Sequence, residues 1–404
     1  MNYVAVLGLA PTEKVAEVSF KYFDNYLVSI GEPLLNKSWT LFQINRQMIK
    51  IIKMKKHFEK KYNPNAKIYL DSGGFQLFMG YVPKNRVKEY VDVYHYILKK
   101  HKDFIDDIFS LDIMNRKWSK DELIKLNDYS ISESINLIKK VPEIADKQLF
   151  IVQTRTTAVF DLWRYLMDKH DVYKYYTKYS FGGLVGLKKE TNAKFSHVVP
   201  FTLWLVSKIH DKNGIINHLH YLGQSSKLAI FSGILMEKIM REKFNLDFKI
   251  TMDSSELIRF TRIEQKLPIV CKNIDDFELI RELKDLEKSF RNHSTVKDDE
   301  HDFEERLCEL TQKGNLQNYD FVDFMCQNIN GIIELSHKII DNINTDDLLN
   351  MNIEQIKELH PVFAQGRFAV EIYNNFQLIN KLLPYVFKDT KKIEEECEFI
   401  LKNY

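Results

Sequence analysis

The chain has 404 residues, of which 58 are Lys or Arg and 56 are Asp or Glu, so its formal net charge is +2. Hydrophobic residues make up 45% and aromatic residues 13%, which excludes a disordered chain, a collagen-like repeat and a small disulfide-stapled domain. No apolar run approaches the roughly 18 residues that a membrane span needs. The four scattered cysteines are typical of free thiols in a reducing compartment. We therefore expect a cytoplasmic protein that does not bind a membrane.

Strand and helix patterns alternate through the first two thirds of the chain. Helical periodicity follows the β-rich runs, for example over residues 86–100 and 130–140. Such alternation predicts parallel βα units, and seven or eight of them fit a TIM barrel as well as a doubly wound sheet. The expected strands cover residues 3–9, 68–71, 108–113, 149–154, 179–184, 219–222 and 248–253.

The character of the chain changes near residue 291. Residues 291–306 are polar and charged and predict a linker or an exposed helix start, and helical periodicity follows over 321–343, 346–359 and 368–386. Thr345, which precedes two aspartates, is the expected N-cap of the second of these helices. We therefore divide the chain into a domain of residues 1–290 and an α-helical C-terminal region of residues 291–404.

This division changes the meaning of the net charge. Residues 291–404 hold 12 basic and 21 acidic residues, a net of −9, whereas residues 1–290 hold 46 basic and 35 acidic residues, a net of +11. The first domain is thus basic enough to hold a phosphate backbone, and near-neutrality does not argue against a nucleic-acid partner.

Glycine is scarce, and five of the 14 glycines lie at two places directly after predicted strands. Gly73 and Gly74 belong to the run Asp-Ser-Gly-Gly-Phe-Gln at 71–76, and the others are Gly182, Gly183 and Gly186. Ligands bind at the carboxyl ends of the strands in parallel α/β folds. The first run offers a carboxylate, a close backbone approach and an aromatic ring, although a capped βα turn is the alternative.

Further polar residues end apolar strands. Asp112 and Gln153 each do so, and on successive strands they would converge on one barrel mouth. Gly182 and Gly183 would present backbone groups to a ligand edge, with a β-bulge as the alternative. Asp253 ends the last strand, and its interpretation as a nucleophile competes with that of a helix cap.

Other residue types favour a structural interpretation. His218 and His220 alternate in a strand but have no cysteine or carboxylate at metal spacing, so structural histidines are favoured over a metal site. Trp163 and Trp204 are expected in the core. The basic stretch 46–61 is typical of a solvated helix face, although its charge density suits a phosphate backbone.

Taken in order, the run at 71–76, Asp112, Gln153, Gly182-Gly183-Leu184 and the pair Asp253 and Arg259 resemble the tRNA-guanine transglycosylase superfamily. The resemblance covers roughly residues 65–260. Members of this superfamily are (β/α)8 barrels that exchange guanine for a 7-deazaguanine. The resemblance therefore implies a (β/α)8 TIM barrel, here with a C-terminal α-helical extension.

The resemblance also implies roles for the residues. Asp253 corresponds to the nucleophile that forms a covalent glycosyl-enzyme, and Asp71 to the general acid/base. Asp112 would accept hydrogen bonds from guanine N1–H and N2–H₂, and Gln153 and the Gly183 backbone N–H would donate to O6. The other base-binding positions are Ser72, Phe75, which would stack on the base, Gly182, Leu184, whose carbonyl would face the 7-substituent, and Arg259, which would support the site near the nucleophile.

The chain departs from the family pattern, since neither the zinc site nor the appended RNA-binding module of the archaeal enzymes is recognisable. Members that modify tRNA bind zinc through a C-x-C-x-x-C run and a later histidine. This sequence has no such run. We therefore expect no metal, and we expect no other cofactor. The sequence therefore resembles the phage and bacterial DNA 7-deazaguanine transglycosylases, which insert such bases, often the 7-cyano form, into DNA and so protect it from host nucleases. The expected partners are DNA and a free 7-deazaguanine base, in the host cytoplasm if the protein is phage-encoded. A tRNA enzyme without zinc and a non-catalytic partner subunit remain alternatives, and the oligomeric state is open.

Overall fold

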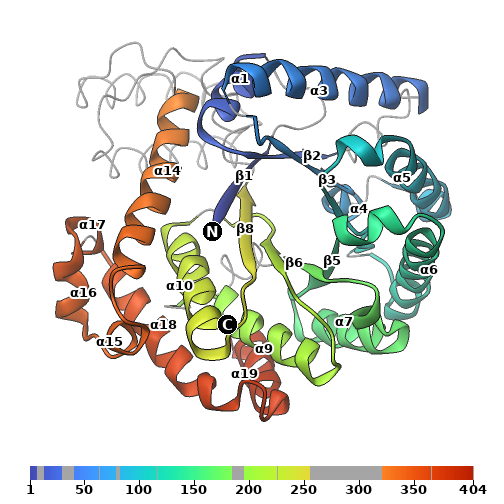
Figure 1. The fold of residues 1–404 in the computed structure, drawn as a ribbon. Helices are drawn as coiled ribbons and strands as arrows, with labels where there is room; N and C mark the ends of the chain where they lie inside the picture. Colours follow the sequence, from blue (N-terminus) through green and yellow to red (C-terminus); the bar gives the residue numbers. More distant parts are fainter. Residues whose placement is uncertain are drawn as a thin grey trace, which may run out of the picture.

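The chain forms a closed barrel of eight parallel strands, paired in sequence order from β1 to β8 and closed by pairing of β8 with β1 (Figure 1). The computed structural model describes residues 1–6, 13–29, 41–62, 64–78, 82–115, 117–183, 195–224, 226–254, 321–364 and 366–403. The prediction of a (β/α)8 TIM barrel with C-terminal helices is confirmed. The strands are β1 (Asn2–Val6), β2 (Asn25–Ser29), β3 (Lys67–Asp71), β4 (Asp107–Phe109), β5 (Gln148–Gln153), β6 (Lys178–Gly182), β7 (His218–Tyr221) and β8 (Lys249–Ser254).

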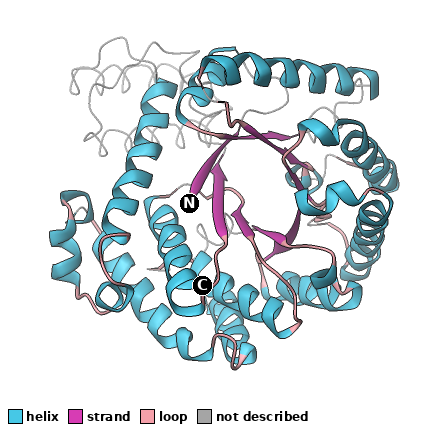
Figure 2. Cartoon of the chain, in the orientation of Figure 1, coloured by secondary structure: helices cyan, strands magenta, loops and turns pink. Residues whose placement is uncertain are grey.

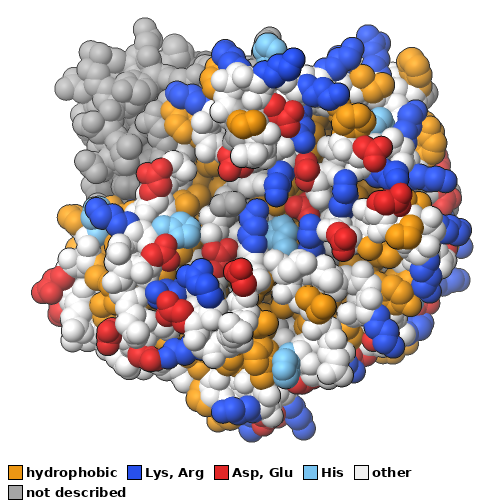
Figure 3. Space-filling model, in the orientation of Figure 1, with side chains coloured by type: hydrophobic (Ala, Val, Ile, Leu, Met, Phe, Trp, Pro, Cys, Tyr) orange, Lys and Arg blue, Asp and Glu red, His pale blue; other side chains and the backbone are white. Residues whose placement is uncertain are grey.

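Helices surround the strands on the outside of the barrel (Figure 2). Three of them begin at polar side chains that accept a backbone N–H of the first turn, namely Ser119, Thr156 and Ser226. Lys and Arg side chains line the top edge of the molecule, over α3 (Figure 3). The helices are α1 (Glu13–Tyr22), α3 (Leu41–Lys61), α4 (Gly74–Phe78), α5 (Val87–His101), α6 (Lys120–Lys140), α7 (Thr157–His170), α9 (Val198–Asp211) and α10 (Lys227–Phe244).

Two strands differ from the sequence prediction. β2 was not predicted, although its apolar run at residues 26–28 is as long as that of β3. The strand expected at 108–113 ends at Phe109. Asn127 of α6 donates to the Ile113 carbonyl at 2.7 Å and accepts its N–H at 2.8 Å, so these backbone groups bind a side chain instead of the sheet. Asp112 therefore follows β4 at a short distance along the chain and is not its last residue.

The C-terminal helices also correct two expectations. The helix expected at 346–359 is two helices, and Asn352 caps the second. Asn344, rather than Thr345, is the N-cap of the first, because its side chain accepts the Asp346 N–H, while the buried Thr345 hydroxyl donates to Glu242 of α10. The helices are α14 (Phe321–Ile340), α15 (Thr345–Leu349), α16 (Ile353–Leu359), α17 (Pro361–Ala364), α18 (Phe368–Leu382) and α19 (Thr390–Asn403).

The C-terminal helices pack directly on the barrel. Helix α14 lies between α10 and α1 and so takes the eighth place in the helical ring, and α18 and α19 pack against α9 (Figure 1). Helix α9 is buried around most of its circumference for this reason, and Trp204 is fully buried, as is Trp163 of α7. The predicted division at residue 290 lies outside the described residues and stays a prediction.

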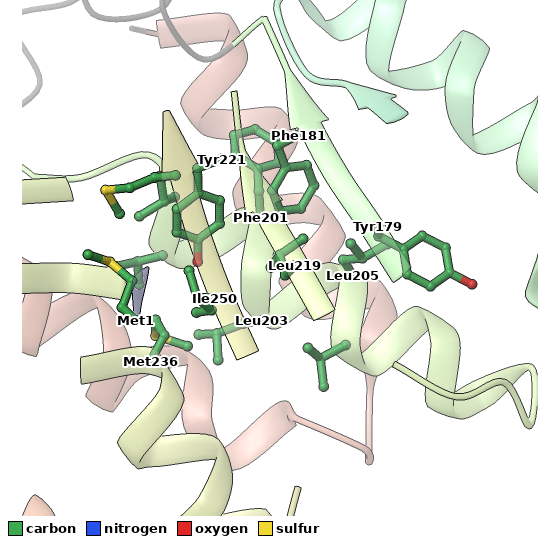
Figure 4. Packing of buried hydrophobic residues seen from close by; sticks show 14 of the residues in the cluster. Met1, Tyr179, Phe181, Phe201, Leu203, Leu205, Leu219, Tyr221, Met236 and Ile250 are labelled. Carbon is green, nitrogen blue, oxygen red and sulfur yellow. The ribbon is translucent and has the colours of Figure 1, made fainter. Parts of the chain in front are cut away.

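Apolar side chains fill the space between the strands and the helices. Phe181 and Tyr221 of β6 and β7 pack against Phe201 of α9, and Ile250 of β8 packs near Met236 of α10 (Figure 4). Burial of such side chains contributes about 1.5–3 kcal/mol each. None of the described helices has the length and apolar character to cross a membrane.

The barrel interior changes from one end to the other. Alternate residues of a strand face the same side, so Lys67, Tyr69 and Asp71 of β3 follow one another along the interior. Tyr69 and Phe109 lie in a buried cluster at mid-height. At the amino ends of the strands lies a group that we call the floor, formed by Lys67, Asp107, Lys178 and Lys249. At the carboxyl ends lies the mouth, which holds the predicted site.

Candidate functional site

Asp71 lies at the mouth, at the end of β3. The β2–β3 register places Ser29 beside it, and the Ser29 hydroxyl and the Gly73 N–H hydrogen-bond its carboxylate. Burial raises the pKa of Asp71, and the negative charge of Asp253 adds to this effect. The carboxyl thus keeps a proton to higher pH than a free aspartate, which suits a general acid.

Asp112 and Gln153 form a hydrogen-bonded pair. The Gln153 amide donates to Asp112 Oδ2, and only 5% of Asp112 is exposed. Burial raises the pKa of Asp112 to about 7, and the charge of Asp71 contributes. The segment that carries Asp112 is fixed from α6, where the Ser130 hydroxyl donates to the Leu111 carbonyl at 3.0 Å. The buried Asp112 and the half-buried Gln153 therefore form a polar pair at the mouth.

Glycines make room for this pair. A Cβ at Gly74 would lie 2.0 Å from Asp112 Oδ1, and one at Gly182 would lie 2.3 Å from Gln153 Nε2. Gly183 has φ of +83°, a conformation that other residues rarely adopt. The two glycine clusters of the sequence thus belong to one site, because Gly74 leaves space for the Asp112 carboxylate and Gly182 leaves space for the Gln153 amide.

Asp253 reaches the mouth from β8 and is 7% exposed. Its Oδ1 accepts the Gly223 N–H at 2.8 Å and lies 3.0 Å from Nε2 of the fully buried His220. In the described part of the chain, no Lys or Arg forms an ion pair with Asp71, Asp112 or Asp253. Three carboxyl groups thus share one end of the barrel, and none of them is paired with a Lys or Arg from the described residues.

The structure brings most of the predicted site residues together and leaves others undescribed. Asp71, Asp112, Gln153 and Asp253 lie at the mouth together with Gly182 and Gly183. Ser72 is fully buried there, and its carbonyl accepts a hydrogen bond from the Tyr90 hydroxyl. Leu184 and Arg259 lie outside the described residues, as does the side chain of Phe75. The roles assigned to all these residues stay predictions.

Sequence reasoning missed three contributors to the mouth. His220, interpreted as structural, contacts Asp253, and Gly223 donates to the same oxygen. Arg155 lies next to Gly183, and its guanidinium lies 4.6 Å from the centre of the Phe78 ring. The available signals were a histidine at an inward position of β7 and a cation two residues after the strand end at Gln153. Among the described residues, no three His, Cys, Asp or Glu side chains cluster as metal ligands would.

Comparisons with known proteins give little beyond this geometry. No family model matches the chain, and no curated protein matches it. Among the solved structures that match is the HpcH/HpaI aldolase from Desulfitobacterium hafniense DCB-2, at 11% identity and a TM-score of 0.31. The match covers 66% of this chain and 91% of the aldolase.

Proposed function

We propose that this chain is a DNA base-exchange enzyme, which replaces guanine with a 7-deazaguanine through a covalent aspartyl-glycosyl intermediate. The observation that carries the proposal is the meeting of Asp71 and Asp253 at the barrel mouth, coupled through their charges and held by different hydrogen bonds. One carboxyl has a raised pKa and the other accepts two hydrogen-bond contacts on one oxygen. Such a division suits one carboxyl for acid/base work and the other for nucleophilic attack.

The reaction would consist of two displacements at the anomeric carbon. Asp253 attacks C1′ of the deoxyguanosine, the C1′–N9 bond breaks, and Asp71 gives its proton to the departing guanine. The incoming 7-deazaguanine then loses its N9 proton to Asp71 and attacks C1′, and the aspartyl ester bond breaks. Two inversions retain the stereochemistry, and both carboxyl groups return to their starting states.

Asp112 and Gln153 would distinguish guanine from adenine. Guanine offers N1–H and N2–H₂ as neighbouring donors and O6 as an acceptor. An ionised Asp112 accepts from the donors, whereas the Gln153 amide and the Gly183 N–H donate to O6. Because the pKa of Asp112 is about 7, arrival of two N–H donors favours its charged form and so couples base binding to proton release.

Helix α3 supports a nucleic-acid partner. Arg46, Lys50 and Lys53 are exposed, and within the described residues they form no ion pair. Figure 3 shows basic side chains gathered over this helix. Phe42 is 74% exposed on the same helix, and an aromatic ring among cations can stack on a nucleic-acid base. This surface favours a polyanionic substrate over a small free nucleoside.

The sequence favours DNA over tRNA, because the cysteine run of the tRNA enzymes is missing. In the test, the full chain is incubated with duplex DNA or with tRNA in the presence of radiolabelled guanine or a labelled 7-deazaguanine. We expect label in DNA and in neither substrate with Asp253→Asn. Label in tRNA alone would support the tRNA enzyme instead, and label in neither would support a non-catalytic subunit.

A second test addresses the α3 surface. We expect the double variant Lys50→Glu/Lys53→Glu to bind DNA at least about 10-fold more weakly. The slope of the logarithm of the binding constant against the logarithm of the salt concentration should become shallower by about two, one for each lost phosphate contact. The matched control is the double variant Lys357→Glu/Lys391→Glu on α16 and α19, which makes the same two charge reversals in the acidic C-terminal region. Equal loss in both variants would show that net charge alone, rather than α3, governs binding.

A further inference from the structure

A line of hydrogen-bonding side chains runs through the barrel interior to Asp253. His218 Nε2 lies 2.7 Å from Thr251 Oγ1, and His220 Nδ1 lies 2.7 Å from the same oxygen. The other nitrogen of His220, Nε2, lies 3.0 Å from Asp253 Oδ1. The line alternates between inward positions of β7 and β8, which pair in register.

Packing fixes the orientation of the His220 ring. His220 and Thr251 are both fully buried, and the Phe109 ring meets the imidazole edge to face at 4.8 Å between centroids. Tyr69 lies on another side, with its ring centre 6.1 Å away. The imidazole therefore cannot turn away from Thr251 and Asp253 without disturbing the barrel core.

Donor and acceptor counting gives one arrangement for two neutral imidazoles beside an ionised carboxylate. Asp253 can only accept, so His220 carries its proton on Nε2 and leaves Nδ1 as an acceptor. The Thr251 hydroxyl must then donate to His220 Nδ1, and its lone pair accepts from His218 Nε2–H. Burial and the nearby lysines lower the pKa of His218 well below its usual value, which keeps that ring neutral. In this arrangement His218 donates to Thr251, Thr251 donates to His220, and His220 donates to Asp253.

We infer that His220, oriented by Thr251 and His218, is a positioning residue for Asp253, which fixes Oδ1 and presents Oδ2 as the attacking oxygen. The inference rests on the proposed function, because it assigns the nucleophile's geometry. Both hydrogen bonds to Asp253 end on Oδ1, and in the part of the chain that is described Oδ2 receives none. Once Oδ2 bonds to C1′, Oδ1 becomes the ester carbonyl oxygen. His220 and the Gly223 N–H then stabilise the carboxylate that departs in the second displacement.

Other titratable groups face this line and are part of its electrostatics. They come from β3, β4, β6 and β8, and the lysines among them act most directly on His218. These groups are Tyr69, Asp71, Asp107, Lys67, Lys178 and Lys249.

The first test needs no activity. The full chain is labelled with ¹⁵N-histidine, and the ring tautomers are read by two-dimensional NMR at pH 7, with His218→Gln and His220→Gln used to assign the signals. We expect both His218 and His220 to carry the proton on Nε2. Thr251→Val should change the His218 and His220 signals together, whereas Thr251→Ser should not. A proton on Nδ1 of His220 would contradict the inference.

The second test measures exchange. His220→Phe should lower kcat at least about 10-fold and leave the KM for the free base unchanged, because Asp253 loses the donor that fixes Oδ1. His220→Gln should recover part of the loss, since its amide can also donate, and Thr251→Ser should recover more than Thr251→Val. A purely structural role predicts an unchanged kcat in all these variants, with changes only in melting temperature.

The two tests separate the two proposals. The expected tautomers without any base exchange would overturn the proposed function and leave the proton arrangement standing. Exchange whose rate is unaltered by His220→Phe and Thr251→Val would overturn the positioning role and leave the proposed function standing.

Discussion

Lysines gather at the amino ends of the barrel strands, whereas carboxyl groups gather at the carboxyl ends. The floor holds three lysines and Asp107, and Lys178 pairs with Asp107 at 2.5 Å. The mouth holds Asp71, Asp112 and Asp253 without a paired Lys or Arg in the described residues. Strand β3 shows the contrast within five residues, from Lys67 at one end to Asp71 at the other. Charge is partly neutralised at the floor, whereas the mouth accumulates like charges and raised pKa values, which is typical of functional sites.

The largest expected effect is on base exchange, and it distinguishes the carboxylate of Asp253 at the mouth from that of Asp107 at the floor. Asp253→Asn removes the nucleophile and should lower base exchange by at least about 10³-fold, with no covalent adduct on a denaturing gel. Asp107→Asn at the floor leaves Lys178 without its partner and should lower the free energy of unfolding by about 2–3 kcal/mol. Its kcat should stay within about threefold of the wild type. Exchange by Asp253→Asn at the wild-type rate would show that the nucleophile is misassigned.

Asp112→Asn tests how far the buried carboxyl group of Asp112 lowers the stability of the fold. The folded-state pKa of about 7 lies above the unfolded value, so wild-type stability falls as pH rises from about 4 through 7. The variant lacks this loss, and its melting temperature should exceed that of the wild type by about 3 °C at pH 8 and by nothing at pH 4.

The same variant should be a poor enzyme. Its amide cannot accept from both guanine donors, so kcat/KM for exchange should fall by about 10³-fold. Calorimetry at the two pH values and the exchange assay measure the two effects separately. A variant that is less stable than the wild type at pH 8 would contradict the assigned raised pKa.

Gly182→Ala tests the space beneath Gln153. The new Cβ would lie 2.3 Å from Gln153 Nε2, so the amide must move away from its place beside Asp112. Such a displacement of the Gln153 amide should lower kcat/KM for exchange by about 10²-fold. The matched control is Gly331→Ala within α14, where a Cβ meets nothing within 4 Å, and it should raise stability by about 0.5–1 kcal/mol with unchanged activity.

The smallest expected effect lies at the floor. Burial and Lys67 lower the pKa of Lys249, so its charged form destabilises the fold below that pKa, and this cost disappears as pH rises toward the unfolded value. Lys249→Met should therefore raise the melting temperature by about 2 °C at pH 7 and by less at pH 10, with exchange unchanged. A loss of exchange activity would show that the floor contributes to the site.

The strand-end residues were predictable because a parallel α/β fold gathers the ends of its strands. Asp71, Gln153 and Asp253 each end an apolar run, and the structure places each at the last or next-to-last position of its strand. Strand β2 was not predicted, although its Ser29 contacts Asp71 and its apolar run at residues 26–28 is as long as that of β3. No aspartate and no pair of glycines follows this run to mark a strand end. The sequence prediction of Thr345 as a helix cap is wrong. Its neighbour Asn344 offers the same chemistry, and only the contact of Thr345 with Glu242 shows which of the two faces the core.

The sequence by itself determined the class of fold and the residue types that gather at the mouth. The reason is that the periodicity of the hydrophobic residues, the positions of the glycines and the polar residues at the strand ends are local properties of the chain. Only the tertiary structure decided that His218, Thr251 and His220 form a line to Asp253 and that α14 completes the helical ring. The opposite charges of floor and mouth were also decided there. These features depend on which strands and helices become neighbours, and closure of the barrel between β8 and β1 sets those neighbours across the whole length of the chain.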